Sequence, residues 1–139
     1  MASTSEPIPA SSALGQWIED LFNRIFFQPD DIISANAFNE GVAREFTARI
    51  NHDRFSRDNF FAAIKQTRLL NALSLQNNRD IQHWDTSDGS GAGCVAQLSH
   101  FKLTNKETGV ITESSTLVLA NIQMVDGKKM LVELTEVAK

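Results

Sequence analysis

The spacing of apolar residues along the chain changes near Leu70. Before this point apolar residues recur every three or four positions, which is typical of an amphipathic helix, and after it they alternate with polar residues, which is typical of strands. The clearest helical run lies between Ser12 and Pro29, and its apolar positions are Leu14, Trp17, Ile18, Leu21, Phe22, Ile25 and Phe26. We expect a helix that is capped by Ser11 or Ser12 and ends before Gln28-Pro29.

The next two segments leave alternatives open. Residues 30–41 allow a short helix with Asp30 or Asp31 as its cap, but the pattern does not assign them. Residues 42–51 favour a half-buried strand, although a continued helix explains much of the same pattern. The inward positions of that strand would be Val42, Phe46, Ala48 and Ile50.

A second helix is predicted after Ser56, a favourable N-cap residue, with Phe55 and Phe60 placed to form a hydrophobic staple. Four strands are predicted beyond Leu70, at about 71–84, 93–105, 110–125 and 128–138. Asp126-Gly127 is the dipeptide that favours a type I′ hairpin, and residues 106–109 form a four-residue loop. These two turns fix the pairing of the last three strands.

That pairing sorts the side chains onto two faces of a sheet. Face one contains Cys94, Ala96, Leu98, His100, Lys102, Ile111, Glu113, Ser115, Leu117, Leu119, Asn121, Gln123, Met130, Val132, Leu134 and Glu136. Its centre pairs Leu98 with Leu117 and Leu119 with Leu134, so we expect the helices to cover it. Face two, with Gln97, Phe101, Val118 and Val137 among its members, would then point outward. We expect it to form a homodimer interface, because exposed half-apolar faces are uncommon on monomers.

Composition narrows the class of protein. The 139 residues carry a net charge of −4 without a basic cluster, so we expect no nucleic-acid partner. One cysteine, Cys94, permits no internal disulfide, and three scattered histidines give no metal-site spacing, so we expect no metal and no cofactor. Residues 1–11 have the composition of a disordered lead-in without signal-peptide character, followed by one domain over 12–139. No segment is long and apolar enough to cross a membrane, and we expect a cytoplasmic protein.

The order of these elements, with the terminal hairpin VDGKKMLVELTEV, resembles the nuclear transport factor 2-like superfamily, and within it the SnoaL-like proteins. The resemblance covers residues 12–138. It implies an α+β fold in which a curved, mostly antiparallel sheet wraps around N-terminal helices to form a cone with an apolar pocket. The superfamily is usually dimeric and includes isomerases, cyclases, dehydratases and binding proteins that are not enzymes. The fold therefore implies a pocket rather than a reaction.

Candidate catalytic groups are few. The ketosteroid isomerases of this superfamily use a pocket tyrosine, and this chain has no tyrosine. His100 on face one is a candidate general base, and His83 with Asp85 is a candidate pair at the pocket mouth. The alternatives are an ordinary strand histidine near the rim and an ordinary strand end. Cys94 is expected to be a buried, unreactive thiol.

Three functional hypotheses follow. The first is a domain that binds an apolar small molecule, and its candidate ligand-binding residues are Trp17, Phe22, Phe60, Leu98, Leu117, Leu119, Asn121 and Val132. The second is a cofactor-free isomerase, cyclase or dehydratase acting on an apolar metabolite. The third is a homodimerisation or adaptor module without a ligand.

Overall fold

The computed structural model describes residues 12–139, so the predicted lead-in over residues 1–11 lies outside the described part of the chain. The elements are α1 (Ala13–Phe26), α2 (Asp31–Gly41), β1 (Val42–Ile50), β2 (Asp53–Ser56), α3 (Arg57–Leu70), β3 (Asn71–Asp85), β4 (Gly93–Asn105), β5 (Ile111–Val125) and β6 (Lys128–Ala138). The two predicted helices and the long strands are confirmed. The segment left open becomes α2, capped by Asp30, and the short β2 was not predicted.

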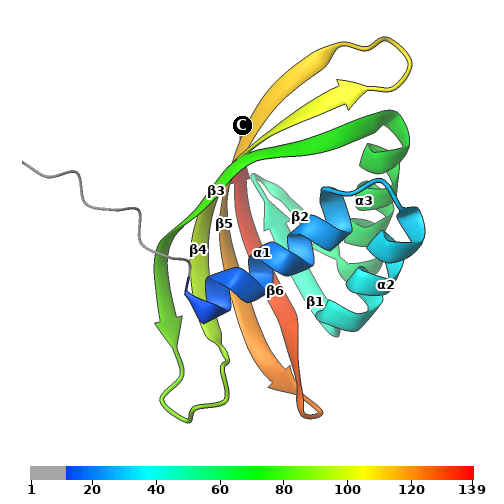
Figure 1. Ribbon diagram of the computed structural model, residues 1–139. Helices are drawn as coiled ribbons and strands as arrows, with labels where there is room; N and C mark the ends of the chain where they lie inside the picture. Colours follow the sequence, from blue (N-terminus) through cyan, green and yellow to red (C-terminus); the bar gives the residue numbers. More distant parts are fainter. Residues whose placement is uncertain (1–11) are drawn as a thin grey trace, which may run out of the picture.

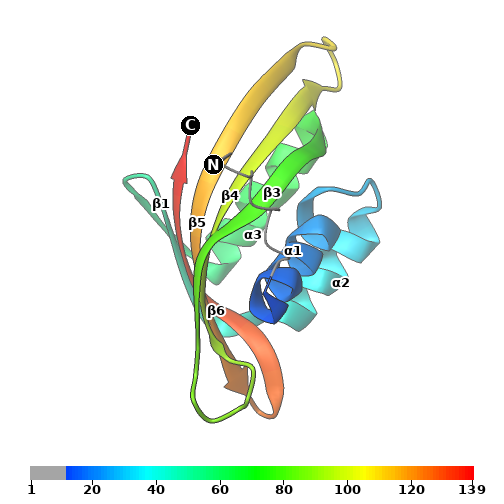
Figure 2. The ribbon, with the colours of Figure 1, turned by 60° about the vertical axis from the view of Figure 1, so that its left-hand side comes forward.

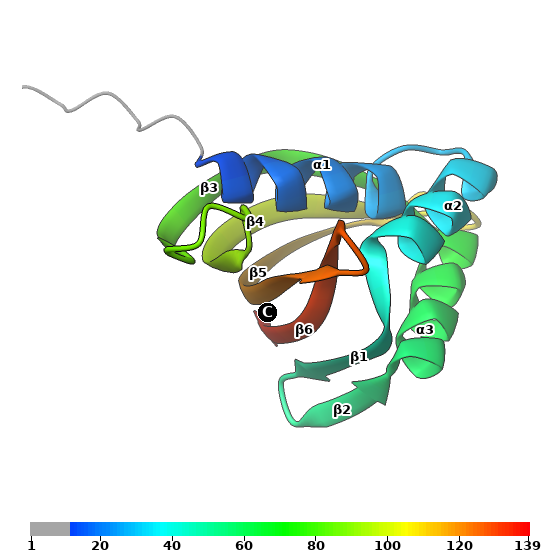
Figure 3. The same ribbon diagram turned by 90° about the horizontal axis from the view of Figure 1, so that it is seen from below.

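The strands form a six-stranded sheet in the order β2-β1-β6-β5-β4-β3, in which β1 and β6 are parallel and the other neighbours are antiparallel. The sheet is strongly curved, and α1 crosses its concave side (Figure 1). Seen from below, α1 lies over the sheet while β1 and β2 turn towards α3 (Figure 3). The predicted fold, a curved and mostly antiparallel sheet around N-terminal helices, is confirmed. None of the helices among residues 12–139 is long and apolar enough to cross a membrane.

The start of α1 is tied to the sheet by a partly buried polar cluster. The Oγ of Ser12 accepts a hydrogen bond from the Gly15 N–H at 2.9 Å, as an N-cap does. The Asp80 carboxylate on β3 accepts hydrogen bonds from the N–H and the hydroxyl of Ser12, both at 2.9 Å, and from Gln97 Nε2 at 2.7 Å. Gln97 Nε2 also donates to the Gly15 carbonyl at 2.9 Å. A Cβ at residue 15 would clash with the Asp80 carboxylate, so this close approach requires glycine.

The other end of α1 is held by Arg68 of α3. Its guanidinium donates hydrogen bonds to the carbonyls of Ile25 and Phe26, at 3.1 and 3.3 Å, and forms an ion pair with Asp31 at 2.9 Å. These carbonyls lie in the last turn of α1, where they lack intrahelical partners. Arg68 therefore joins all three helices at one point.

Both predicted turns are present. Asp126 and Gly127 have φ of 51° and 79°, the left-handed conformation that a type I′ turn requires, and they join Val125 to Lys128. The β4–β5 pairing follows the predicted register and brings Lys102 opposite Glu113. The β4–β5 hairpin extends beyond the helices (Figure 2).

A β-bulge changes the register of β6. Ile122 pairs with Leu131, but the next residue of β5, Asn121, pairs with Glu133 rather than Val132. One extra residue on β6 reverses the direction of every later side chain relative to β5. Ala120, not Leu119, is therefore opposite Leu134, and the predicted pair of Leu119 with Leu134 is wrong.

The predicted assignment of the two faces is also wrong for β4 and β5, although Leu134 and Glu136 of face one do lie on the covered side. On β5, Val118 is 4% exposed and lies beneath the helices, whereas its neighbour Leu119 is 54% exposed on the outer side. The helices cover the face-two residues of β4 and β5, together with Leu131 and Leu134 of β6. The buried set under α1 is small and β-branched, which allows a helix to approach closely. Its members include Val95, Val118, Ala120 and Ile122.

Candidate functional site

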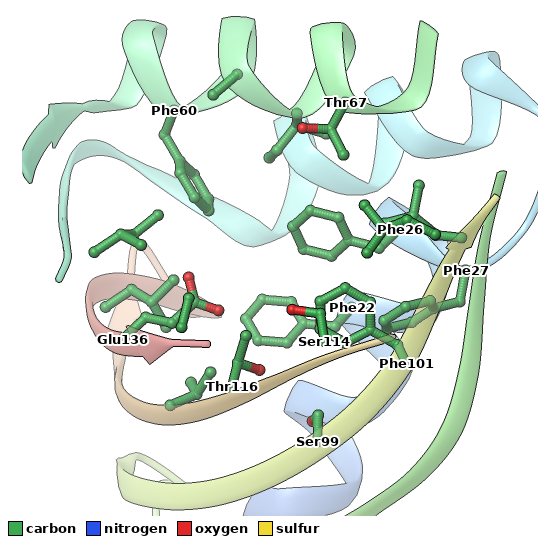
Figure 4. Close-up of a pocket in the computed structure, with 18 of the residues that line it drawn as sticks. Phe22, Phe26, Phe27, Phe60, Thr67, Ser99, Phe101, Ser114, Thr116 and Glu136 are labelled. Atoms are coloured by element: carbon green, nitrogen blue, oxygen red, sulfur yellow. The ribbon is translucent and has the colours of Figure 1, made fainter. Parts of the chain in front are cut away.

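A cavity of about 250 Å³ lies between the helices and the concave side of the sheet. Most of its wall is apolar, and its aromatic side chains come from α1, α3 and β4 (Figure 4). The lining residues are Phe22, Phe26, Phe27, Ile50, Phe60, Ala63, Ile64, Thr67, Leu73, Gln97, Ser99, Phe101, Leu103, Ser114, Thr116, Val118, Leu134, Glu136 and Ala138. A hollow of this kind, apolar with a few polar groups, is the usual form of a small-molecule site.

The aromatic wall follows from the last turn of α1. Phe22 and Phe26 are four residues apart and lie on one side of the helix, with ring centroids 5.7 Å apart. Phe27, just after the helix, lies 5.7 Å from Phe101 of β4. Phe60 of α3 closes the opposite end of the cavity (Figure 4). Because these rings come from separate elements, the cavity exists only when helices and sheet are assembled.

The sheet contributes hydroxyl groups to the cavity. Ser99 lies on β4, Ser114 and Thr116 lie on β5, and Thr67 faces them from α3. The Ser99 hydroxyl donates to Asn78 Oδ1 at 2.5 Å, and the Ser114 hydroxyl donates to the Lys139 carbonyl at 2.9 Å. Since these two hydrogens are engaged outside the cavity, the two oxygens offer acceptor lone pairs to a ligand.

Among the described residues, Glu136 is the one ionisable residue that lines the cavity. The β6 bulge turns its side chain to the concave side, two residues beyond Leu134, and its carboxyl group points into the hollow (Figure 4). Within residues 12–139 its side chain makes no hydrogen bond and no ion pair. Burial raises the pKa of Glu136 to about 7, because an apolar environment disfavours the charged form.

Two of the predicted ligand-binding residues, Phe22 and Phe60, line this cavity. Trp17 is partly buried against the apolar core and does not line the cavity. Leu98, Leu117, Leu119 and Asn121 lie on the outer side of the sheet, and Val132 lies at the bulge outside the cavity lining. These strand residues were predicted in the pocket because the two faces were assigned in reverse. One step along a strand moves a side chain to the other side of the sheet.

The predicted catalytic residues also lie away from the cavity. His100 is exposed on the outer side, opposite Ser115. The structure does bring His83 and Asp85 together, with Nδ1 and Oδ2 3.4 Å apart, but both are exposed at the end of β3. Cys94 is exposed and not buried as predicted, with its Sγ 3.8 Å from Asn121 Oδ1. Among residues 12–139 no cluster of three or more His, Cys, Asp or Glu side chains could hold a metal ion.

Sequence reasoning placed Glu136 on the face expected to be covered but did not name it as a candidate site residue. Its sequence signal is weak, a glutamate at an inward position of β6 between Leu134 and Ala138. The bulge that turns all three residues inward has no glycine or proline to mark it. The hydroxyl residues were assigned to an outward face because that face is only partly apolar.

The chain was compared with known proteins by sequence and by structure. No protein-family profile matches it, and no curated protein matches its sequence. Solved structures match over most of the chain, with low sequence identity. A ketosteroid isomerase-like protein from Erwinia carotovora atroseptica has a TM-score of 0.67 at 14% identity, covering 91% of each chain.

Two further matches bear on the fold. An NTF2-like protein of unknown function from Exiguobacterium has a TM-score of 0.58 at 15% identity, covering 86% of this chain and 92% of the other. A candidate SnoaL-like polyketide cyclase from Mesorhizobium loti has a TM-score of 0.53 at 11% identity, covering 90% and 98%. At these identities the similarity concerns architecture, not activity. The chain has the cone-shaped fold of the nuclear transport factor 2-like superfamily.

Proposed function

We propose that this protein binds an apolar small molecule in the cavity between its helices and its sheet. The observation that carries the proposal is a hollow of about 250 Å³ between the helices and the sheet, walled by phenylalanine rings. Apolar ligands gain free energy when they replace water in such a hollow. The ketosteroid isomerase-like and SnoaL-like neighbours support a ligand-binding or isomerase-like class for the domain.

Native mass spectrometry of the purified protein, followed by denaturing extraction, tests this proposal. Ala63→Phe would fill the cavity from α3, and Ala62→Phe makes the same change one residue away on the exposed side of the helix. We expect wild type and Ala62→Phe to retain an apolar compound, or to bind added phenyl compounds, and Ala63→Phe to lose this ability. Equal binding by both variants would place the ligand elsewhere and contradict the proposal.

A second candidate function is cofactor-free proton transfer, the chemistry expected of an isomerase, cyclase or dehydratase. One observation favours it: the Glu136 carboxyl group points into the cavity (Figure 4), and burial raises the pKa of Glu136 to about 7, which suits proton exchange at neutral pH. Glu136 thus replaces His100 and His83 as the candidate base, since neither histidine lines the cavity.

5-Nitrobenzisoxazole is a suitable probe of this second function. A carboxylate base removes its C3 proton, the C–H electron pair completes the nitrile, and the N–O bond breaks to give 2-cyano-4-nitrophenolate. We expect wild type to accelerate this reaction, with a rate that rises with pH through about 7 as the base form accumulates. Glu136→Gln should abolish the acceleration, and equal rates in both proteins would remove Glu136 as the base.

We also propose a homodimer formed through the outer face of the sheet, with a cytoplasmic setting. Leu117 is 40% exposed and Leu119 is 54% exposed at the centre of this face, and Val137 is exposed beside them on β6. Burying these side chains against a second copy would remove apolar surface from water. A protein that forms this dimer and leaves its cavity empty would be the interaction module considered above.

A further inference from the structure

Among the described residues, the cavity wall contains an acidic side chain and no basic side chain. Glu136 contributes a carboxyl group, and none of the lining residues is lysine, arginine or histidine. A ligand that carried a carboxylate or phosphate would meet a second acid and no cation in a medium of low dielectric constant. Such a pair repels strongly, so the wall disfavours anionic ligands.

Three basic side chains on α3 and β4 have other contacts. Arg68 of α3 is engaged by Asp31 and by two carbonyls of α1, and Lys65 of α3 lies 4.7 Å from the centre of the Phe61 ring. Lys102 of β4 faces Glu113 on the outer side of the sheet, with Nζ and Oε1 4.0 Å apart. Within residues 12–139, Glu136 therefore has no protein cation to balance it when it ionises.

Two of the remaining polar groups, the hydroxyls of Ser99 and Ser114, favour a ligand that donates hydrogen bonds. The hydroxyl hydrogens of Ser99 and Ser114 are used by Asn78 and Lys139, so their oxygens can only accept from a ligand. The faces of phenylalanine rings attract cations, and five such rings line the cavity. A carboxylate, acceptor oxygens and aromatic rings together fit an ammonium group better than a carbonyl.

We propose that the cavity selects organic amines, binding the protonated nitrogen at the Glu136 carboxylate and the apolar body among the phenylalanine rings. This inference rests on the proposed function, because it names the chemical class of ligand for the same cavity. Formation of the ion pair would lower the pKa of Glu136, so amine binding near pH 7 releases a proton from the site.

Three probes with one carbon skeleton test the charge preference: 2-phenylethylamine, 2-phenylethanol and phenylacetate. Calorimetry at pH 8 should give at least about tenfold tighter binding of the amine than of the alcohol, from ion-pair and cation–π attraction, and no saturable binding of phenylacetate. Calorimetry at pH 7 in two buffers of different ionisation enthalpy should show proton release with the amine.

Two variants with the same change of charge locate the effect. Glu136→Gln should reduce amine binding to the level of alcohol binding in the same variant. Glu133→Gln, on the same strand but exposed and opposite Asn121, should keep the preference for the amine. Alcohol binding without a preference for the amine, or an equal loss in both variants, would overturn this inference alone. Failure of wild type to bind any of the three probes would overturn the proposed function with it.

Discussion

The two sides of the sheet differ in a way that the apolar content of their residues does not predict. The outer side carries Leu98, Leu117 and Leu119 at its centre, yet two of these leucines are among the exposed apolar residues. The concave side carries Ser99, Ser114, Thr116 and Glu136, yet it is the covered side. A sheet face that lines a hollow needs less apolar surface than a face that packs fully, because the helices provide the aromatic wall.

The largest effect that separates the two sides comes from one charge placed on either of two neighbouring residues of β5. Val118→Asp buries a carboxylate beneath the helices, and we expect it to lower the free energy of unfolding by about 4 kcal/mol or more. Leu119→Asp places the same group on the exposed outer side of the protomer and should cost the protomer less than about 1 kcal/mol. Urea unfolding of both variants measures this, and similar losses would contradict the face assignment.

The pH dependence of stability sharpens the comparison, because Glu136 is an ionisable group that lines the cavity on the concave side. Its pKa is about 7 in the folded chain, compared with an ordinary value of 4.5. Between these values the unfolded chain loses the proton and the folded chain keeps it, so the group's stabilising contribution is full below pH 4.5 and is lost as the pH rises to about 7.

This loss amounts to about 3 kcal/mol, since one pKa unit corresponds to about 1.4 kcal/mol. Glu136→Gln should not show this loss, because glutamine does not ionise. The variant should therefore gain stability relative to wild type as the pH rises from 4.5 to 7, and it should keep this gain above pH 7. Chemical unfolding at pH 5 and pH 8 measures the difference, with Glu133→Gln as the control for charge. If the difference in free energy of unfolding between wild type and Glu136→Gln stayed constant with pH, Glu136 would be well solvated.

The third effect concerns what holds α1 on the concave side. Asp80→Ala removes a carboxylate that accepts three hydrogen bonds, two from Ser12 and one from Gln97, and we expect a loss of about 2 kcal/mol. Asp85→Ala removes a carboxylate from the exposed end of the same strand, where the pair with His83 contributes less than about 1 kcal/mol. Thermal unfolding should rank the two variants in this order, and a reversed order would reject the anchoring role of Asp80.

The smallest effect concerns the outer side alone. If Leu119 lies in a dimer interface, Leu119→Lys should weaken the dimer by about tenfold, or about 1.4 kcal/mol. Leu69→Lys exposes the same charge on α3, away from the sheet face, and should leave the dimer unchanged. Light scattering over a range of concentrations gives the mass, and a wild-type monomer of 15.4 kDa at micromolar concentration would contradict the dimer.

Much of the fold could be predicted because its signals are local. Ser56 caps α3 as expected by accepting from the Asn59 N–H, and the Phe55 and Phe60 rings approach to 6.3 Å. Asp126-Gly127 sets the start of the β5–β6 pairing. Each of these features depends on residues within a few positions of one another, so the sequence contains the whole signal.

The site could be predicted only in part, because it depends on contacts between distant segments. Phe22 and Phe60 were found because helical spacing shows which side of a helix is apolar. The sheet face carrying Leu98, Leu117 and Leu119 was predicted to be the covered one. His100 and Asn121 share that face, so they were predicted in the pocket but lie on the outer side. The bulge after Leu131 leaves no mark in the sequence, yet it brings Glu136 into the cavity.

The most direct test of this account is a titration of the Glu136 side-chain carboxyl carbon by NMR in ¹³C-labelled protein, with the resonance assigned by its absence in Glu136→Gln. The structure places this carboxyl group in the hollow between helices and sheet, and burial there raises the pKa of Glu136 to about 7, so we expect a midpoint of about pH 7. A midpoint at the ordinary value of 4.5 would show a solvated carboxylate and would contradict both the position of Glu136 and the cavity as the functional site.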